Sequence, residues 1–124
     1  MKLRIKGDSI RLRLTQGEVH ALEQQGVVED RARFGAGATL VYRLTRDRRT
    51  PAVAATYADG VLEVRLPEEA ALNWCRSNEV GLTGTQQAAP DAQLRIAVEK
   101  DFACLTAREG EDESDNFPNP RQSC

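Results

Sequence analysis

The sequence contains few of the residues that build metal sites and histidine-dependent active sites. It has a single histidine and three cysteines in 124 residues. Cys75, Cys104 and Cys124 do not stand at the close spacing of zinc ligands, and His20 has no serine, cysteine or aspartate signature beside it. We therefore expect no metal site, no cofactor and no catalytic histidine.

Long apolar runs are missing as well. The opening MKLRIKGDSIRLRL lacks the apolar core of a signal peptide, and no stretch approaches the roughly 18 residues of a membrane helix. An odd number of widely spaced cysteines is typical of free thiols in a reducing compartment. These absences predict a cytoplasmic protein that has no membrane association.

Aromatic residues make up only 5% of the chain, and none stands among the basic strand positions described below. The net charge is −2. A nucleic-acid-binding surface usually combines a basic net charge with aromatic stacking platforms, so nucleic acid is not a favoured partner. No phosphate-loop, dinucleotide or nucleophile-elbow motif is present, and FGAGA is expected to be a turn.

Strict alternation of basic and apolar residues dominates the part of the sequence that remains. Residues 2–6 and 10–14 alternate in this way around the turn-forming GDS, which predicts a hairpin. Thr15 and Glu18 have the spacing of a capping box and predict a helix over residues 16–25. A second helix is expected over residues 67–76, with Pro67 as its first residue. Further strands are expected at VVEDRARF, TLVYRLT, AVAATY, VLEVRL, EVGLTG and QLRIAVEKD.

The predicted order ββαββ occurs twice. IRLRLTQGEVHAL aligns with LEVRLPEEAALNW at an offset of 52 residues, and LVYRLTRD aligns with LRIAVEKD at an offset of 54. We interpret this as an internal duplication of about residues 1–47 and 52–101. The alternative is that two amphipathic units resemble each other for physical reasons alone.

The predicted fold class is α+β, with about eight mostly antiparallel strands and two short helices. Two helices can cover one face of such a sheet, so the apolar side of the strands should lie beneath them. A curled sheet and a closed barrel both fit this pattern. Residues 1–108 are expected to form a single domain, and residues 109–124 an acidic, proline-containing tail.

The side of the strands opposite the apolar residues is basic. Only Glu29, Glu63 and Glu99 accompany the ten cations there, which are Lys2, Arg4, Lys6, Arg11, Arg13, Arg31, Arg33, Arg43, Arg65 and Arg95. One interpretation is an ordinary solvated face. The other is an anion site, because arginine binds carboxylate and phosphate with two parallel hydrogen bonds. The candidate anion-binding residues are Lys2, Arg4, Lys6, Arg11, Arg13, Arg43, Arg65 and Arg95.

The end of the chain carries a compact negative charge. Its carboxylates are Glu109, Glu111, Asp112, Glu113 and Asp115. One alternative is a disordered, solubilising end. The other is an ordered segment that Phe117 anchors and whose carboxylates lie near Lys2, Arg4, Lys6, Arg11 and Arg13.

The opening KLRIKGDSIRLRLTQGEV and the ending EKDFACL…EDESDNFPNP resemble a family of short bacterial proteins without an assigned function. This resemblance spans most of the chain and implies no activity. At the level of fold, the layout is also similar to CYTH-like phosphohydrolases, whose duplicated units close into an eight-stranded tunnel. Those enzymes open with a metal-binding Glu-x-Glu-x-Lys strand, which residues 2–6 match only at Lys6.

The function that these features favour is a non-enzymatic anion-binding or interaction domain. Its partner would be an acidic protein segment or a phosphorylated small molecule. The alternative is a CYTH-like phosphohydrolase, which would use the same cations to stabilise charge on a phosphorylated small molecule. A third interpretation is a structural protein whose basic face is incidental.

Overall fold

The computed structural model describes residues 1–103 and 114–118, and its elements follow the predicted order of two ββαββ units. The first unit comprises β1 (Lys2–Ile5), β2 (Ser9–Leu14), α1 (Gln16–Gln25), β3 (Val27–Gly35) and β4 (Ala38–Asp47). The second unit comprises β5 (Ala54–Ala58), β6 (Val61–Pro67), α2 (Glu68–Arg76), β7 (Gly81–Ala89) and β8 (Ala92–Lys100).

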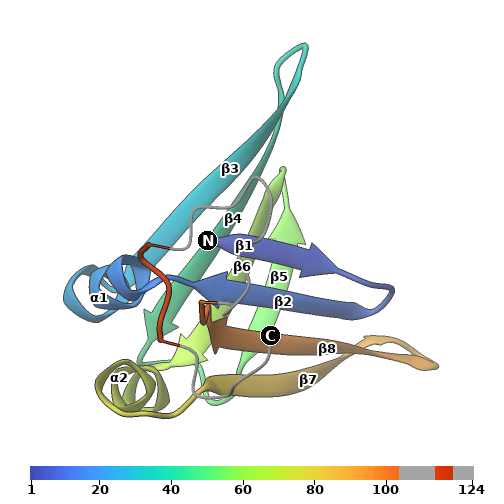
Figure 1. Ribbon diagram of the computed structural model, residues 1–124. Coiled ribbons are helices and arrows are strands. Elements are labelled where there is room, and N and C mark those ends of the chain that lie inside the picture. The colour runs from blue at the N-terminus through green and yellow to red at the C-terminus, as the bar shows by residue number, and fades with distance from the viewer. Residues whose placement is uncertain (104–113, 119–124) are drawn as a thin grey trace.

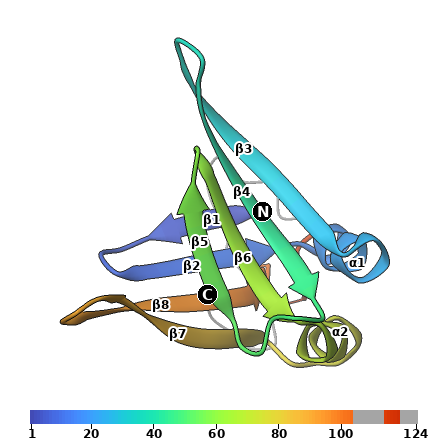
Figure 2. The ribbon, with the colours of Figure 1, turned by 180° about the vertical axis from the view of Figure 1, so that it is seen from behind.

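The strands are divided between two four-stranded sheets. Sheet A has the order β1-β2-β8-β7, and sheet B has the order β3-β4-β6-β5. Each sheet consists of two antiparallel hairpins joined by a parallel central pair, β2 with β8 in sheet A and β4 with β6 in sheet B. The two sheets face each other with their strands crossing, and both helices lie side by side at one end (Figures 1 and 2).

The expectation that two helices cover the apolar face of a single sheet is wrong. The apolar faces of sheets A and B cover each other, because helices of 10 and 9 residues are too short to cover eight strands. The closed barrel does not form, since the eight strands stay in two sheets. Helix α2 also begins one residue later than predicted, because Pro67 still pairs with Asp47 at the end of β6.

The repeat of the ββαββ unit, which we interpret as an internal duplication, is confirmed in the strand registers. In sheet A, Ile10 pairs with Ile96. The residue 52 positions after Ile10 is Leu62, the residue 54 positions before Ile96 is Tyr42, and these two residues pair in sheet B. The same offsets relate the β1–β2 register to that of β5–β6. They also relate the β3–β4 hairpin to the β7–β8 hairpin, including the irregularity between residues 33 and 35 and between residues 87 and 89. Each hairpin of one unit therefore pairs with a hairpin of the other unit.

The core lies between the sheets and continues under the helices. Leu12 and Val98 of sheet A, and Leu44 and Val64 of sheet B, have at most 1% of their surface exposed. Trp74 of α2 is fully buried, and its ring nitrogen donates to the carbonyl of Val80 at 3.1 Å. The predicted apolar side of the strands is therefore the buried side along most of their length, whereas Ile5, Phe34 and Tyr57 near the strand ends are exposed, at 59%, 71% and 69%.

Equivalent cations hold the ends of the two helices. Arg46 donates to the carbonyls of Leu22 and Glu23 at 3.0 Å each, and its guanidinium also pairs with Glu68 at the start of α2. Lys100, which is 54 residues further along, donates to the carbonyl of Ser77 at 2.7 Å. A cation at the C-terminal end of a helix satisfies its free carbonyls and complements its dipole.

A C-terminal strap, residues 114–118, returns to the body of the protein. The backbone of Phe117 exchanges hydrogen bonds with Asp101 and Ala103, at 2.8 and 2.6 Å. Its ring lies 5.7 Å from that of Phe102 and 5.6 Å from the Lys100 ammonium. Phe117 is partly buried, as predicted for an anchor.

Asp115 is the one acidic tail residue inside the described part, and it contacts α1. Its carbonyl accepts from the backbone of Gln16 at 3.0 Å, and its carboxylate accepts from the backbone of Gly17 at 3.2 Å. The expected contact with the basic strands is therefore wrong for Asp115, because free amides at a helix N-terminus offer a carboxylate a better site. The prediction for Glu109, Glu111, Asp112 and Glu113 concerns residues outside the described ranges.

We predict that the close approach of Asp115 is the reason why position 17 favours glycine over a residue with a side chain. A Cβ at this position would lie 2.9 Å from the Asp115 carboxylate. In an Asp115→Ala background, Gly17→Ala should raise the free energy of unfolding by about 1 kcal/mol, since alanine is the better helix former. In the wild-type background the gain should be clearly smaller, because the new methyl group displaces the carboxylate. Urea unfolding of the four variants measures this coupling, and equal gains in both backgrounds would contradict it.

A second prediction concerns acid stability. Glu68 accepts a hydrogen bond from Arg48 at 2.7 Å and pairs with Arg46, and these contacts lower the pKa of its carboxyl group. A carboxylate with a lowered pKa stabilises the fold above its unfolded pKa, and this contribution is lost as the pH falls through the folded pKa. The stability difference between wild type and Glu68→Gln should therefore shrink from about pH 6 to about pH 3. Unfolding curves at both pH values test this, and a difference that grows on acidification would contradict it.

Candidate functional site

The outer face of sheet A carries its polar side chains in three rows that cross the strands. The strand registers define these rows. In order from β1 to β7, the rows are Lys2–Arg13–Glu99–Gly81, Arg4–Arg11–Ala97–Thr83 and, beginning with Lys6 just beyond β1, Lys6–Ser9–Arg95–Thr85.

Sheet B carries an equivalent set of rows, and its central row contains carboxylates that pair with its cation. There Arg43 of β4 stands between Glu29 of β3 and Glu63 of β6. The Arg43 guanidinium lies 2.7 Å from the Glu29 carboxylate and 3.9 Å from that of Glu63. The hydrogen bond from Arg43 lowers the pKa of Glu29. Arg31 and Arg65 pair with the same two glutamates, at 3.0 and 3.1 Å.

In sheet A the equivalent positions have different charges. The offsets of 52 and 54 residues relate each position of this row to one on sheet B. Ala97 corresponds to Arg43. Arg11 corresponds to Glu63, and Thr83 corresponds to Glu29. A cation between two anions on sheet B is thus replaced on sheet A by a methyl group between a cation and a hydroxyl. This central row therefore keeps a positive charge that its own residues do not balance.

The remaining charges on sheet A do not restore neutrality. Arg11 and Arg13 share the single carboxylate of Glu99, at 3.5 and 3.4 Å. Within the described ranges, Arg4, Lys6 and Arg95 have no carboxylate at salt-bridge distance. All three side chains are exposed. Cations that lack counter-charges on a neighbouring strand repel each other, so an external anion would stabilise this face.

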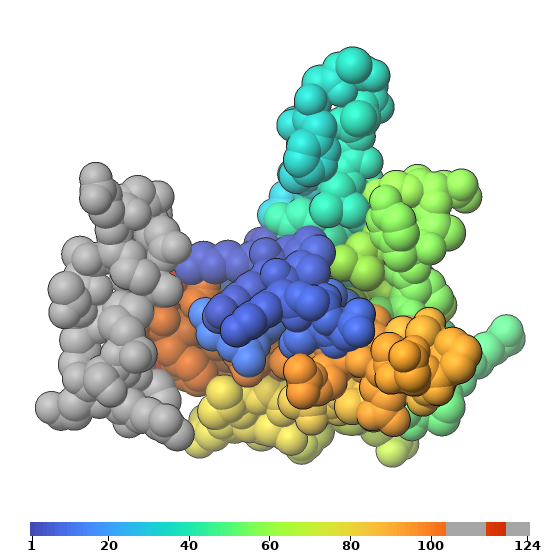
Figure 3. All heavy atoms as spheres, turned by 90° about the vertical axis from the view of Figure 1, so that its right-hand side faces the viewer, coloured from blue at the N-terminus to red at the C-terminus, as the bar shows by residue number. Residues whose placement is uncertain are grey.

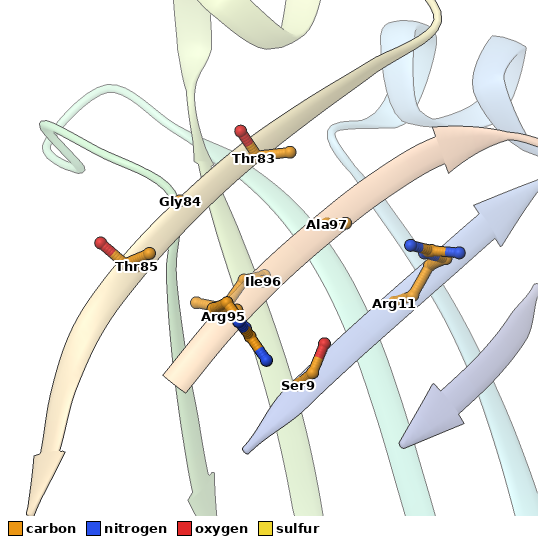
Figure 4. A pocket seen from close by; sticks show the side chains of 8 residues that line it. All are labelled: Ser9, Arg11, Thr83, Gly84, Thr85, Arg95, Ile96 and Ala97. Carbon is orange, nitrogen blue, oxygen red and sulfur yellow. The ribbon is translucent and has the colours of Figure 1, made fainter. Parts of the chain in front are cut away.

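An open depression of about 650 Å³ lies over Ala97. The cations of Arg11 and Arg95 and the hydroxyls of Ser9, Thr83 and Thr85 line it (Figure 4). These groups come from three neighbouring strands, β2, β8 and β7, and they surround the smallest side chain of the row. Guanidinium and hydroxyl groups both donate hydrogen bonds to oxyanions.

A smaller depression adjoins this one and shares two residues with it. Arg4, Lys6, Ser9 and Arg11 line it, around the end of the β1–β2 hairpin. The cationic surface of sheet A therefore extends without interruption from the edge strand β1 to the depression over Ala97.

The structure divides the eight predicted anion-binding residues between two surfaces. Six of them lie on sheet A or at its hairpin end, namely Lys2, Arg4, Lys6, Arg11, Arg13 and Arg95. Arg43 and Arg65 lie on the outer face of sheet B, where Glu29 and Glu63 pair with them. The prediction of one shared basic face is therefore wrong for these two, because the strands of each unit enter different sheets. Lys2 contacts the buried carboxylate of Asp101 at 2.9 Å.

Sequence reasoning missed the hydroxyl residues and the alanine of the depression. Ser9, Thr83, Thr85 and Ala97 alternate with apolar residues on the same side as the cations, so their orientation could have been inferred. Their proximity could not, because it depends on the parallel pairing of β2 with β8.

The cysteines, the histidine and the carboxylates form no second site in the part of the chain that the structure describes. No three His, Cys, Asp or Glu side chains gather there in a way that could hold a metal ion. His20 is exposed on α1. Cys75 packs against the core, and burial raises the pKa of its thiol.

Comparison with known proteins gives a family but no activity. No helix in the described ranges has the length and apolar character needed to cross a membrane. No curated protein and no solved structure matches the chain, so the resemblance to CYTH-like phosphohydrolases is not supported. A family of unknown function, DUF7009, has a model that matches residues 1–121, and the chain therefore belongs to that family.

Proposed function

We propose that the protein is a non-enzymatic anion-binding module that holds a phosphorylated small molecule on the outer face of sheet A. The observation that supports this most directly is the charge difference between two duplicated faces. Sheet B places a cation between two glutamates, whereas sheet A places an open depression beside Arg95, which has no carboxylate at salt-bridge distance within the described ranges, and Arg11, which shares Glu99 with Arg13.

Phosphate suits the depression over Ala97 for two reasons. Arg11 and Arg95 supply forked, permanently charged donors from adjacent strands, and such donors match the oxygen geometry of a phosphate group. Ser9, Thr83 and Thr85 add neutral donors around the rim. Donors on several sides of a small residue suit a tetrahedral anion that rests on the Ala97 methyl group.

A phosphohydrolase would need a group that activates water in addition to these cations. On this face Glu99 already pairs with Arg11 and Arg13. No observation on the described residues therefore favours the enzyme over the binding module.

We predict that Arg95→Gln weakens phosphate binding by about tenfold or more, because it removes a charge-assisted hydrogen bond. The matched control is Arg65→Gln on sheet B, whose arginine already pairs with Glu63, and it should leave the affinity unchanged. Titration of each protein with inorganic phosphate and with a simple phosphomonoester, followed by calorimetry or by NMR shifts of Thr83, Thr85 and Ala97, provides the measurement. The proposal would be overturned if neither ligand binds, or if both variants bind as the wild type does.

A further inference from the structure

We infer that the outer edge of β1 is a docking site for a strand of another protein, and that this strand alternates acidic with apolar residues. This inference does not depend on the depression over Ala97. It rests on a comparison of two equivalent sheet edges, β1 in sheet A and β5 in sheet B, and on the charge of the residues along β1.

The edge of β5 is closed by a side chain. The backbone N–H of Ala55 donates to the amide oxygen of Gln86 at 2.8 Å, and the Gln86 amide nitrogen donates to the carbonyl of Ala55 at 2.7 Å. Gln86 thus mimics the two hydrogen bonds that a neighbouring strand would form. It also links the edge of sheet B to β7 of sheet A.

Among the residues that the structure describes, no side chain closes the equivalent edge of β1 in this way. By the offsets of the duplication, Leu3 corresponds to Ala55, and Ala32 stands where Gln86 stands. The methyl group of Ala32 cannot form these hydrogen bonds. Within the described ranges, no backbone group outside sheet A bonds to Leu3 or Ile5.

The hydrogen-bond pattern of the hairpin shows which backbone groups face outward. The N–H of Lys6 donates to the carbonyl of Ser9 at 2.9 Å, so these two residues form a hydrogen-bonded pair. Such pairs alternate along antiparallel strands, which makes Arg4 with Arg11 the next one. The N–H and C=O groups of Leu3 and Ile5 therefore point away from β2, and an added strand could pair with them.

The side chains along this edge define the chemistry of the partner. Residues that face Lys2, Arg4 and Lys6 across the new strand pair would lie on the basic outer side and should be acidic. Residues that face Leu3 and Ile5 would lie on the inner side and should be apolar. Ile5 is an apolar side chain that is 59% exposed, and an apolar partner residue would cover it.

The β1–β2 hairpin lies at the surface of the molecule, with β1 as the edge strand of sheet A. Figure 3 shows the N-terminal hairpin at the front of the molecule, with the β3–β4 hairpin projecting above it. The chain's own acidic run does not have the required pattern, because the positions that alternate with Glu109, Glu111, Glu113 and Asp115 are Gly110, Asp112 and Ser114, none of which is apolar. The occupant is therefore a segment of another protein.

The test uses a seven-residue peptide that alternates glutamate and valine, with a shuffled peptide of the same composition as its control. The alternating peptide should bind the full-length protein and slow amide hydrogen exchange at Leu3 and Ile5. Arg4→Gln should weaken this binding about fivefold. Arg95→Gln, which changes the depression over Ala97, should not affect it.

The decisive variant is Ala32→Gln, which places at the β1 edge the side chain that closes the β5 edge. It leaves every cation in place, so it should abolish peptide binding and keep the binding of inorganic phosphate. Three results would overturn the inference: equal binding of the alternating and shuffled peptides, unchanged exchange at Leu3 and Ile5, or wild-type peptide affinity in Ala32→Gln. None of these results bears on phosphate binding, so the two proposals can fail separately.

Discussion

The parallel pairing of β2 with β8, and of β4 with β6, is the constraint on which the rest of the structure depends. Each pair joins strands from different repeats, so neither repeat can complete a four-stranded sheet alone. This exchange brings the apolar faces of the two sheets together. It also carries β4 and β8 to the ends of the helices, where Arg46 and Lys100 bind the terminal carbonyls. We expect the two repeats to fold together, because an isolated one would expose an apolar face and an unpaired strand.

The two units have similar core positions and different outer faces. Core positions must fill the space between the sheets, and even small volume changes there cost stability. Outer positions mostly contact water, so their charges can change with little effect on stability. On sheet B the arginines pair with Glu29 and Glu63, whereas on sheet A cations surround Ala97. The edge strands differ in the same way, at Gln86 and Ala32.

Much of this architecture could be predicted from local sequence patterns. The capping box of Thr15 and Glu18 gave the bounds of α1 correctly, and alternation identified the buried side of the strands. Alignment of the two halves anticipated registers that agree down to their irregularities. These features depend on neighbouring residues or on repetition, and a single sequence contains both kinds of information.

The division into two sheets and the composition of the site could not be predicted in this way. Both depend on the pairing of residues 9–14 with residues 95–100, which no local pattern specifies. Without that pairing, Arg43 and Arg65 could not be separated from the cations of sheet A. Ser9, Thr83 and Thr85 could not be placed beside Arg95 either. The contact of Asp115 with the start of α1 is also long-range, so the sequence does not specify it. The glycine at position 17 is the one local feature that this contact requires.

The central claim is that sheet A binds anions because its central row lacks the charge pattern of sheet B. The most direct measurement is a phosphate titration of a variant that has this pattern, with Arg11→Glu, Thr83→Glu and Ala97→Arg combined. These exposed or half-exposed positions carry such residues on the equivalent face of sheet B, so the variant should fold. The account predicts that it no longer binds phosphate. A folded variant that binds phosphate with wild-type affinity would contradict it.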